Sequence, residues 1–282
     1  MKPTNEHLAK VWRYYDRTES RIGYQVLLGG TKHFGWYESG DRSYDFARAL
    51  IRMEDQLGNQ LGLPKDSSVL DAGCGTGAVA RAMASRFQLN VTGIDILDFN
   101  LDAARSRSKK AQLDQKTKFT WGDYREIPFG SDDFDGVYTM ETLVHSDDVD
   151  KVLGEFYRVL KPGGKLIMFE YSSTPLAKLS EISKKAFLKV CDIAAMPGWI
   201  ELEDGILEAK LQHAGFINIT STDITNKMLP MLHWFAILGR FPYFVGRVIR
   251  KEQKTVNSMS GVEMYRHQEA WKYNIYTAQK PG

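Results

Sequence analysis

Short apolar runs and amphipathic stretches alternate along most of the chain from about residue 66 onward. Runs of β-branched and aromatic residues closed by turn residues are typical of strands, whereas apolar residues spaced three or four apart are typical of helices. The pattern predicts strands at 67–73, 90–96, the first part of 117–129, 134–141, 165–173, 217–225 and 270–280, and helices at 78–87, 101–113, 148–164 and 204–216. This alternation predicts an α/β protein with a doubly wound, parallel, seven-stranded sheet that binds ligands at the carboxyl ends of its strands.

Three segments fall outside this alternation. Residues 1–60 have a helical and aromatic pattern, residues 175–200 follow the fifth strand, and residues 226–268 are rich in Phe, Trp, Met and Leu. Insertions at the carboxyl end of such a sheet commonly build the substrate pocket; simple packing onto the core is the alternative. We therefore predict a single domain over 1–282, divided into an N-terminal helical cap (1–60), a core (61–174, 201–225 and 269–282) and inserted helical lid segments (175–200 and 226–268).

The longest apolar stretch, residues 228–249, has the length of a membrane span. It is interrupted by two prolines and three basic or titratable residues: Pro230, His233, Arg240, Pro242 and Arg247. A buried or lid helix pair is therefore expected, and a helix lying on a membrane surface stays open as the alternative.

Composition narrows the class of protein further. With 282 residues the chain can bury a sizeable core, and 37 Lys+Arg against 35 Asp+Glu leave a formal charge of only +2, so no nucleic-acid partner is expected. Cys74 and Cys191 form no disulfide framework, and neither cysteines nor histidines have metal-ligand spacing, so no metal is predicted. The polar first residues lack an apolar signal core, which favours a reducing, cytoplasmic location.

A glycine-rich turn, "VLDAGCGTGAVA", joins the first strand to its helix and carries Gly73, Gly75 and Gly77. Glycines allow a backbone to approach a ligand closely, and the helix that follows points its amides at that ligand. The turn also satisfies the dinucleotide pattern G-x-G-x-x-G/A, and Asp95 follows Gly73 by 22 residues, where a ribose-binding acid belongs. A nicotinamide-dependent oxidoreductase is therefore one interpretation.

Three further features favour another cofactor. Asp71 ends the first strand, where its charge would repel a pyrophosphate but attract an amino group. Asp123, in "GDYREIPF", follows the third strand and is suited to accept hydrogen bonds from an adenine amino group. The stretch "RVLKPGGKLIMFE" leads into the fifth strand.

Taken together, these motifs resemble the class I S-adenosylmethionine-dependent methyltransferases over residues 66–171 and, more loosely, 201–281. The resemblance implies a Rossmann-like fold with S-adenosyl-L-methionine as cofactor. It implies that Asp71 with the Gly73 and Gly75 backbone holds the methionine moiety, Asp95 the ribose, and Asp123 with Tyr124 the adenine. Ile96 and Thr139 are also predicted to contact the cofactor. An acid-lined cradle suits a cationic sulfonium.

Two titratable residues, Glu141 and His145, stand where the fourth strand ends, in "YTMETLVH". An alkene acceptor would become a carbocation on methylation and then need a base, whereas an amine would need a weaker base and a phenol could use His145 directly. We predict both residues as catalytic; the alternatives are a helix-start acid for Glu141 and a buried, satisfied histidine for His145. Because DNA and many RNA base methyltransferases carry N/D-P-P-Y/F here, this stretch argues against a nucleic-acid base as acceptor.

The N-terminal stretch "YYDRTESRIGYQVLLGGTKHFGWYESGD" resembles the entry segment of sterol side-chain, tocopherol and small-isoprenoid C-methyltransferases. Tyr14, Tyr15, His33, Phe34 and Trp36 match by position, as does the later E-x-x-x-H. The resemblance implies that the tyrosine pair closes over the cofactor, so we assign Tyr14 to cofactor binding and Tyr15 to catalysis; packing is the alternative for either one. The chain is short beside sterol enzymes, which weakens the case for a sterol more than that for an apolar acceptor.

The sequence thus predicts transfer of a methyl group from S-adenosylmethionine to a small, largely apolar acceptor, with C-methylation of an isoprenoid or sterol-like molecule leading. O- or N-methylation of a natural product, quinone or amine is the alternative within this class. A nicotinamide-dependent oxidoreductase and a non-enzymatic protein that binds cofactor to dock a partner are the alternatives outside it. Peripheral membrane contact through 228–249 and homo-oligomerisation both stay open.

Overall fold

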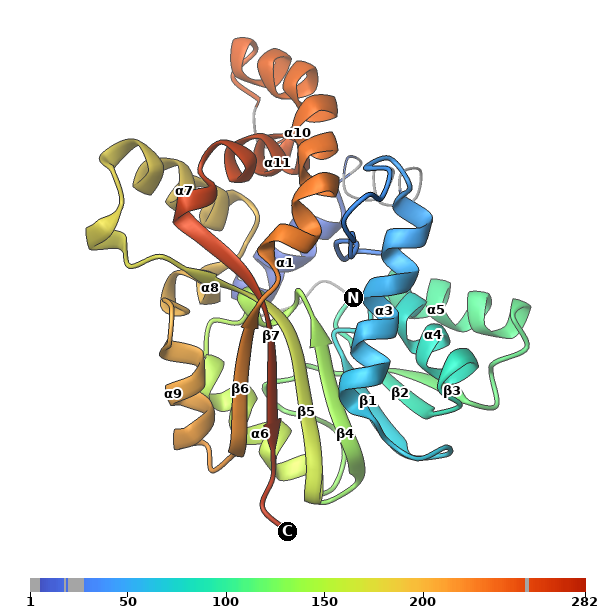
Figure 1. Cartoon of the computed structure of the whole chain (residues 1–282). Coiled ribbons are helices and arrows are strands. Elements are labelled where there is room, and N and C mark those ends of the chain that lie inside the picture. The colour runs from blue at the N-terminus through green and yellow to red at the C-terminus, as the bar shows by residue number, and fades with distance from the viewer. Residues whose placement is uncertain (1–5, 18, 20–27, 252–253) are drawn as a thin grey trace.

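A seven-stranded sheet forms the centre of the protein, seen in a computed structural model that describes residues 6–17, 19, 28–251 and 254–282 (Figure 1). The strands lie in the order β3-β2-β1-β4-β5-β7-β6. Their bounds are β1 Ser68–Ala72, β2 Asn90–Asp95, β3 Thr117–Trp121, β4 Phe134–Met140, β5 Leu160–Ser173, β6 Ile217–Asp223 and β7 Trp271–Gln279. The fold class predicted from the alternating pattern, a doubly wound α/β sheet, is confirmed.

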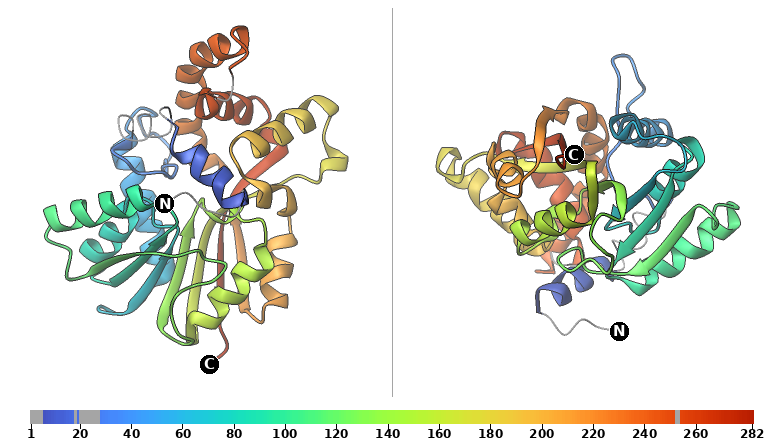
Figure 2. Two further views of the ribbon diagram at one scale, coloured as in Figure 1. Left: turned by 180° about the vertical axis from the view of Figure 1, so that it is seen from behind. Right: turned by 90° about the horizontal axis from the view of Figure 1, so that it is seen from below.

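Helices cover both faces of this sheet, as a parallel arrangement requires. On one face α3 (Phe46–Leu61) packs against α4 (Ala78–Arg86), and α5 (Asp98–Lys110) follows at the β3 edge. On the other face α6 (Val149–Val159) packs against α9 (Ile206–His213) (Figure 2). Residues 160–164, expected to close the helix before the fifth strand, instead form the first part of the long strand β5.

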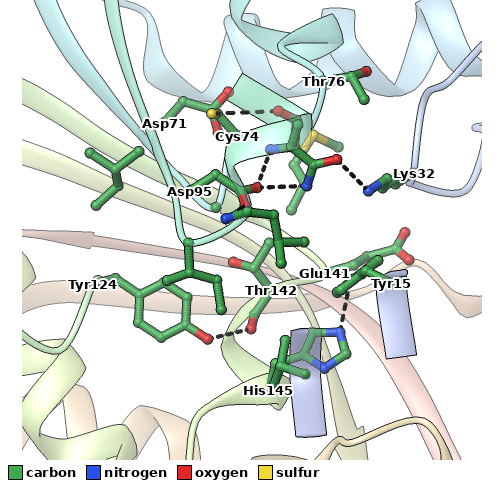
Figure 3. Close-up of a pocket in the computed structure, with 18 of the residues that line it drawn as sticks. Tyr15, Lys32, Asp71, Cys74, Thr76, Asp95, Tyr124, Glu141, Thr142 and His145 are labelled. Carbon is green, nitrogen blue, oxygen red and sulfur yellow. Dashed lines mark hydrogen bonds between the residues drawn. The ribbon is translucent and has the colours of Figure 1, made fainter. Parts of the chain in front are cut away.

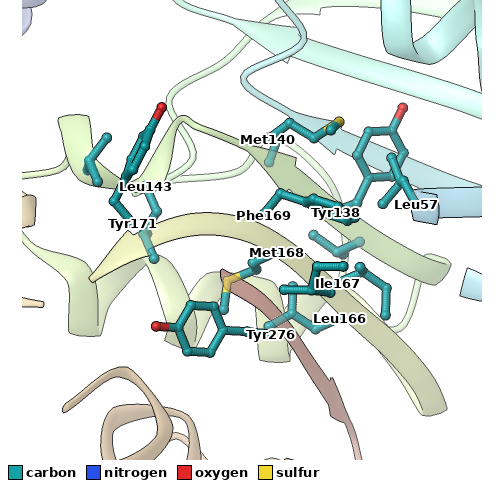
Figure 4. Close-up of a cluster of buried hydrophobic side chains, with 14 of the residues drawn as sticks. Leu57, Tyr138, Met140, Leu143, Leu166, Ile167, Met168, Phe169, Tyr171 and Tyr276 are labelled. Carbon is teal, nitrogen blue, oxygen red and sulfur yellow. The ribbon is translucent and has the colours of Figure 1, made fainter. Parts of the chain in front are cut away.

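The core lies between the central strands and these helices. Leu57 of α3, Tyr138 of β4 and Phe169 of β5 are fully buried and belong to one apolar cluster (Figure 4). Because β4 and β5 are covered on both faces, they carry nearly continuous apolar runs rather than an alternating pattern. This packing fixes the carboxyl ends of β1, β2 and β4 beside one another at one end of the sheet.

The last strand departs from the predicted parallel sheet. β7 runs antiparallel to both β5 and β6, whereas the remaining pairs are parallel. After β6 the chain enters α10 (Thr225–Val248) and α11 (Val256–Arg266), which lie beyond the carboxyl ends of the parallel strands (Figure 1). Because the chain does not return to the opposite edge, β7 starts where the other strands end.

Helices lie beyond the carboxyl ends of the parallel strands. They are α1 (Glu6–Tyr15), α7 (Glu181–Ile193), α8 (Pro197–Glu201), α10 and α11. The expected helix pair at 228–249 is one continuous helix, α10, which contains Pro230 and Pro242. Proline removes its own N–H and kinks a helix, and Pro242 lies in the exposed half of α10, where water can replace the lost hydrogen bond. None of the helices in the described part of the chain is long and apolar enough to cross a membrane.

Candidate functional site

A pocket opens at the carboxyl ends of β1, β2 and β4, and the glycine turn forms one of its walls (Figure 3). Gly73 and Gly75 have φ angles of 89° and 51°, in the left-handed region that favours glycine. A Cβ atom on Gly73 would lie 2.7 Å from Cγ2 of Thr142, whose hydroxyl donates to the carbonyl oxygen of Ala72 over 3.0 Å. The turn can therefore pack against Thr142 only with glycine at this position.

Asp95 ties the glycine turn to the end of β2. Its Oδ2 accepts hydrogen bonds from the backbone N–H of Gly75 (2.8 Å) and from Nδ2 of Asn100 (3.2 Å), and its Oδ1 accepts from the N–H of Leu97 (2.8 Å). The carboxylate and the adjacent Ile96 both line the pocket. Burial raises the pKa of Asp95, and these donors compensate for much of that desolvation.

Asp71 lies deeper in the same pocket and is buried. Within the described part of the chain no donor meets its Oδ2 with hydrogen-bond geometry, although the Tyr138 hydroxyl lies close enough to lower the pKa of this carboxyl group. Burial raises the pKa of this carboxyl group to about 7, because the anion is removed from water without full compensation. An unpartnered carboxylate oxygen beside the glycine turn is suited to a cationic ligand group such as an ammonium.

Asp123 and Tyr124 line the far end of the pocket. Arg125 binds the Asp123 carboxylate at distances from 2.7 to 3.1 Å and also pairs with Asp147 over 2.5 Å. The Tyr124 hydroxyl donates to the carbonyl oxygen of Thr142 over 3.0 Å. The Asp123 carboxylate is therefore already paired, and the predicted adenine contact would share it with Arg125.

Glu141 stands directly after β4 with a φ of 59°, in a conformation that few non-glycine residues adopt. Its Oε1 accepts from the N–H of Phe34 (2.8 Å) and the hydroxyl of Tyr273 (2.9 Å), and its Oε2 accepts from the hydroxyl of Tyr171 (2.6 Å). Burial raises the pKa of Glu141. The side chain thus turns toward the N-terminal segment and β7 instead of capping the next helical turn.

The acid that caps the helical turn η1 (Leu143–His145) is Glu170 of β5. This residue was not singled out from the sequence. Oε1 of Glu170 accepts from the N–H groups of Thr142 (2.7 Å) and Leu143 (2.8 Å) and from Oγ1 of Thr139 (3.1 Å). Burial raises the pKa of Glu170 to about 7. The signal was available, since Glu170 is the single acid in the apolar run "KLIMFEYSS". Thr139, predicted to touch the cofactor, is fully buried and does not line the pocket.

His145 and Tyr15 meet at the mouth of the pocket. Nδ1 of His145 is 2.7 Å from the carbonyl oxygen of Ala195 and so carries the proton, while Nε2 accepts from the Tyr15 hydroxyl over 2.9 Å. Burial lowers the pKa of His145 to about 4. The imidazole is therefore neutral at pH 7 and fixed in one tautomer.

A second, apolar cavity of about 310 Å³ adjoins the pocket and shares Lys32, His33 and Glu141 with it. Aromatic and aliphatic side chains dominate its wall, among them Tyr14, Phe34, Tyr171, Leu232, Phe235 and Met264. Tyr14, predicted to contact the cofactor, faces this cavity, and its hydroxyl donates to Oδ1 of Asn257 over 2.8 Å. The other predicted site residues, apart from Thr139, line the first pocket.

Lys32 is a further residue that the sequence did not single out. Its Nζ donates to Oδ1 of Asn100 over 3.1 Å and lies 4.4 Å from the centroid of the Tyr15 ring. Burial lowers the pKa of Lys32 to about 8. No pattern marks this lysine in the sequence, because only the fold of residues 28–45 brings it between the pocket and the cavity.

Residues 70–168 match a family model described as a methyltransferase domain. The S-adenosyl-L-methionine-dependent Diels-Alderase iccD of Talaromyces variabilis is 34% identical over 288 residues, covering 99% of this chain and 98% of that protein. Sterol 24-C-methyltransferase erg-4 of Neurospora crassa is 30% identical over 83% of this chain, which spans 61% of that enzyme's length. Among solved structures, the [4+2]-cyclase SpnF superposes with a TM-score of 0.78 at 23% identity, over 96% of this chain and 95% of that one.

This chain belongs to the S-adenosyl-L-methionine-dependent methyltransferase family, and its cofactor is S-adenosyl-L-methionine. The resemblance drawn from the glycine turn, Asp95 and the "LKPGG" stretch is thereby confirmed, and the nicotinamide-dependent interpretation is wrong. The residues of the pocket fit such a cofactor, since the unpartnered Oδ2 of Asp71 can meet a cationic group.

Proposed function

We propose that this enzyme methylates a carbon atom of a small, apolar, isoprenoid or sterol-like acceptor. The proposal rests above all on the position of Glu141, whose carboxylate lies on the wall shared by the glycine-turn pocket and the apolar cavity. A titratable group on this wall can reach both a cofactor in the pocket and an acceptor in the cavity. The likeness to a sterol 24-C-methyltransferase supports the same chemistry.

The pocket residues divide the cofactor among them. Asp71 and the backbone of Gly73 and Gly75 hold the amino-acid moiety, Asp95 with Ile96 the ribose, and Tyr124 with Asp123 the adenine. When bound, S-adenosylmethionine supplies a methyl group carried on a cationic sulfonium. Tyr15, oriented by its hydrogen bond to His145, lines the pocket and can close over the bound cofactor.

The cavity provides what a carbon acceptor requires. An alkene that gains a methyl group becomes a carbocation, and the rings of Phe34, Tyr171 and Phe235 on the cavity wall can stabilise positive charge. Glu141 then removes a proton from the neighbouring carbon, and its raised pKa makes the carboxylate a better base than one in water. His145 is a weaker candidate base because its pKa is about 4.

Product analysis tests this proposal. The full-length protein is incubated with S-adenosylmethionine and a panel of isoprenoid alkenes and sterols, and both S-adenosylhomocysteine and the product mass are measured. C-methylation predicts equal amounts of S-adenosylhomocysteine and of a product heavier by one methylene unit, with the new methyl on carbon by NMR. A methyl found on oxygen or nitrogen would replace C-methylation with the O- or N-methylation alternative.

A second candidate function is the intramolecular [4+2] cyclisation of a linear polyene. It is favoured by the whole-length likeness to iccD, which includes the cap and lid that surround the cavity, whereas this chain spans only 61% of the sterol enzyme. Such a reaction transfers no proton, and both oxygens of Glu141 are already engaged as acceptors. Holding a polyene in one folded shape can by itself contribute up to about 7–11 kcal/mol, and Lys32 could donate to a carbonyl of the polyene.

The two candidates give different products when linear polyenes are added to the panel of the same assay. Cyclisation predicts a product isomeric with its substrate and no release of S-adenosylhomocysteine. It also predicts that S-adenosylhomocysteine supports turnover in place of S-adenosylmethionine, because the methyl group is not consumed. A product with the same mass as its substrate would therefore exclude C-methylation and support cyclisation.

A further inference from the structure

The carboxyl-terminal half of α10 and its C-cap expose a row of large apolar side chains, called here the α10 stripe. It consists of Ile237, Leu238, Phe241, Phe244, Val245 and Val248 of the helix and of the C-cap residue Ile249. Phe241 is 76% and Phe244 64% exposed. These residues are three or four positions apart, so they share one side of the helix. Neighbouring exposed apolar side chains, aromatic ones above all, are typical of surfaces that bind a partner or a membrane.

The charged residues beside the stripe in the described part of α10 and the turn after it are basic. Arg240, Arg247, Arg250 and Lys251 are exposed beside it, and Lys254 follows in the next turn. Residues 225–251 contain neither Asp nor Glu, and Glu252 is the one acid between Lys251 and Lys254 in the sequence. An apolar stripe bordered by cations complements a lipid surface with anionic head groups, where apolar side chains enter the acyl region and basic groups remain among the phosphates.

The apolar cavity reaches this same surface. Leu238 belongs to the stripe and, with Pro242, also lines the cavity beside the glycine-turn pocket. The far end of α10 projects beyond the other helices and away from the sheet (Figures 1 and 2). A surface that covers the stripe would therefore lie at the wall of the cavity, within reach of an apolar molecule leaving a bilayer.

We propose that the α10 stripe and its basic border dock this protein onto an anionic lipid surface, so that apolar substrate enters the cavity from the bilayer. The helix lies along the surface without crossing it. The docking goes beyond the proposed reaction and holds equally for methyl transfer and for cyclisation, since both need an apolar substrate.

Flotation of the full-length protein with vesicles tests the docking. Phosphatidylcholine vesicles are compared with vesicles of phosphatidylcholine and phosphatidylserine, at low and high salt. We expect binding to the anionic vesicles, at least tenfold weaker binding of the Phe241→Ser/Phe244→Ser variant, and a similar loss for Arg250→Glu/Lys251→Glu. Ile182→Ser, which removes a 74% exposed apolar side chain of α7, and Lys109→Glu/Lys110→Glu on α5 are the matched controls and should bind as the original protein does.

Other results would overturn the proposal. The proposal would be wrong if the original protein bound neither kind of vesicle. It would also be wrong if the control variants lost as much vesicle binding as the stripe variants. A concentration-dependent dimer in sedimentation that dissociates in Phe241→Ser/Phe244→Ser would assign the stripe to a second copy of this chain. Turnover of a short, water-soluble substrate separates this proposal from the proposed function, because the stripe variants should retain it while losing turnover of vesicle-borne substrate.

Discussion

The Tyr15 hydroxyl donates a 2.9 Å hydrogen bond to Nε2 of His145, and the opposite nitrogen of the same ring faces the carbonyl oxygen of Ala195. This arrangement makes His145 a neutral acceptor that orients Tyr15 over the pocket. Tyr15→Phe should therefore lower turnover with little change in the free energy of unfolding, because one hydrogen bond contributes only about 1 kcal/mol. Steady-state rates beside chemical denaturation would check this, and Tyr44→Phe, at an exposed tyrosine, is the control.

Stability should fall in mild acid because of His145. Its pKa is lowered from 6.5 to about 4 by burial, so the unfolded chain binds the proton more readily than the folded protein does. The contribution is fully present above pH 6.5 and is lost as the pH falls through 4, on the order of 3 kcal/mol in total. Urea unfolding from pH 7 to pH 4.5 should show a shallower pH slope in His145→Gln than in the original protein. His213→Gln, at an exposed histidine, should keep the original slope.

Glu141→Gln distinguishes the two candidate functions. As a base in C-methylation, Glu141 should contribute about 10²–10⁴-fold to the rate, while binding of S-adenosylhomocysteine stays nearly unchanged. Turnover within a few-fold of the original enzyme would instead favour cyclisation or a structural role. Glu181→Gln, an exposed acid of α7, controls for the loss of one charge.

Asp95→Ala should weaken cofactor binding by about 2–3 kcal/mol, because the ribose would lose a charged hydrogen-bond acceptor. The N–H of Gly75 also loses its acceptor in this variant, so the glycine turn should loosen. Titration calorimetry with S-adenosylhomocysteine measures the change, with the exposed Asp102→Ala as control. Equal affinities for the two variants would remove the ribose assignment.

Cofactor affinity should rise with pH through neutrality because of Asp71. Its pKa is raised to about 7 by burial, so only above that pH is the carboxylate ionised in the empty pocket and ready for a cationic amino group. As the pH rises toward 7, the dissociation constant of S-adenosylhomocysteine should fall by up to about tenfold per pH unit. Above pH 7 it should level off. Asp71→Asn should bind more weakly at pH 8 and lose most of this dependence. An unchanged slope in this variant would place the titrating group elsewhere.

Gly73→Ala should destabilise the protein, whereas Gly154→Ala should not. At Gly73 a Cβ would lie 2.7 Å from Thr142 and the φ of 89° strains any side chain, which costs on the order of 1–3 kcal/mol. At Gly154, in α6, a Cβ meets nothing within 4 Å, and alanine should stabilise the helix by about 0.5–1 kcal/mol. Thermal unfolding of the two variants should move in opposite directions.

Much of the fold was readable from local sequence, because each signal depends on near neighbours. The apolar runs marked all seven strands, and Gly73, Gly75 and Asp95 marked the cofactor pocket. These features repeat with the period of a strand or helix, or occupy a single turn, and such patterns do not depend on what packs against them. The direction of β7 was not readable from the sequence. It depends on the end of the sheet at which α10 and α11 leave the start of β7, and this is a tertiary feature.

The residues around Glu141 show what only the tertiary structure decided. Phe34, Tyr171 and Tyr273 all donate to this carboxylate, yet they are 107, 30 and 132 residues away from it in the chain. Tyr14 was assigned to the cofactor by position but faces the apolar cavity, and Lys32 was unmarked but lies between the two spaces. The sequence by itself determined the family and the place of the cofactor, because strand ends and turns are local. Packing of distant segments decided which side chains face the substrate, because such contacts leave no short-range pattern.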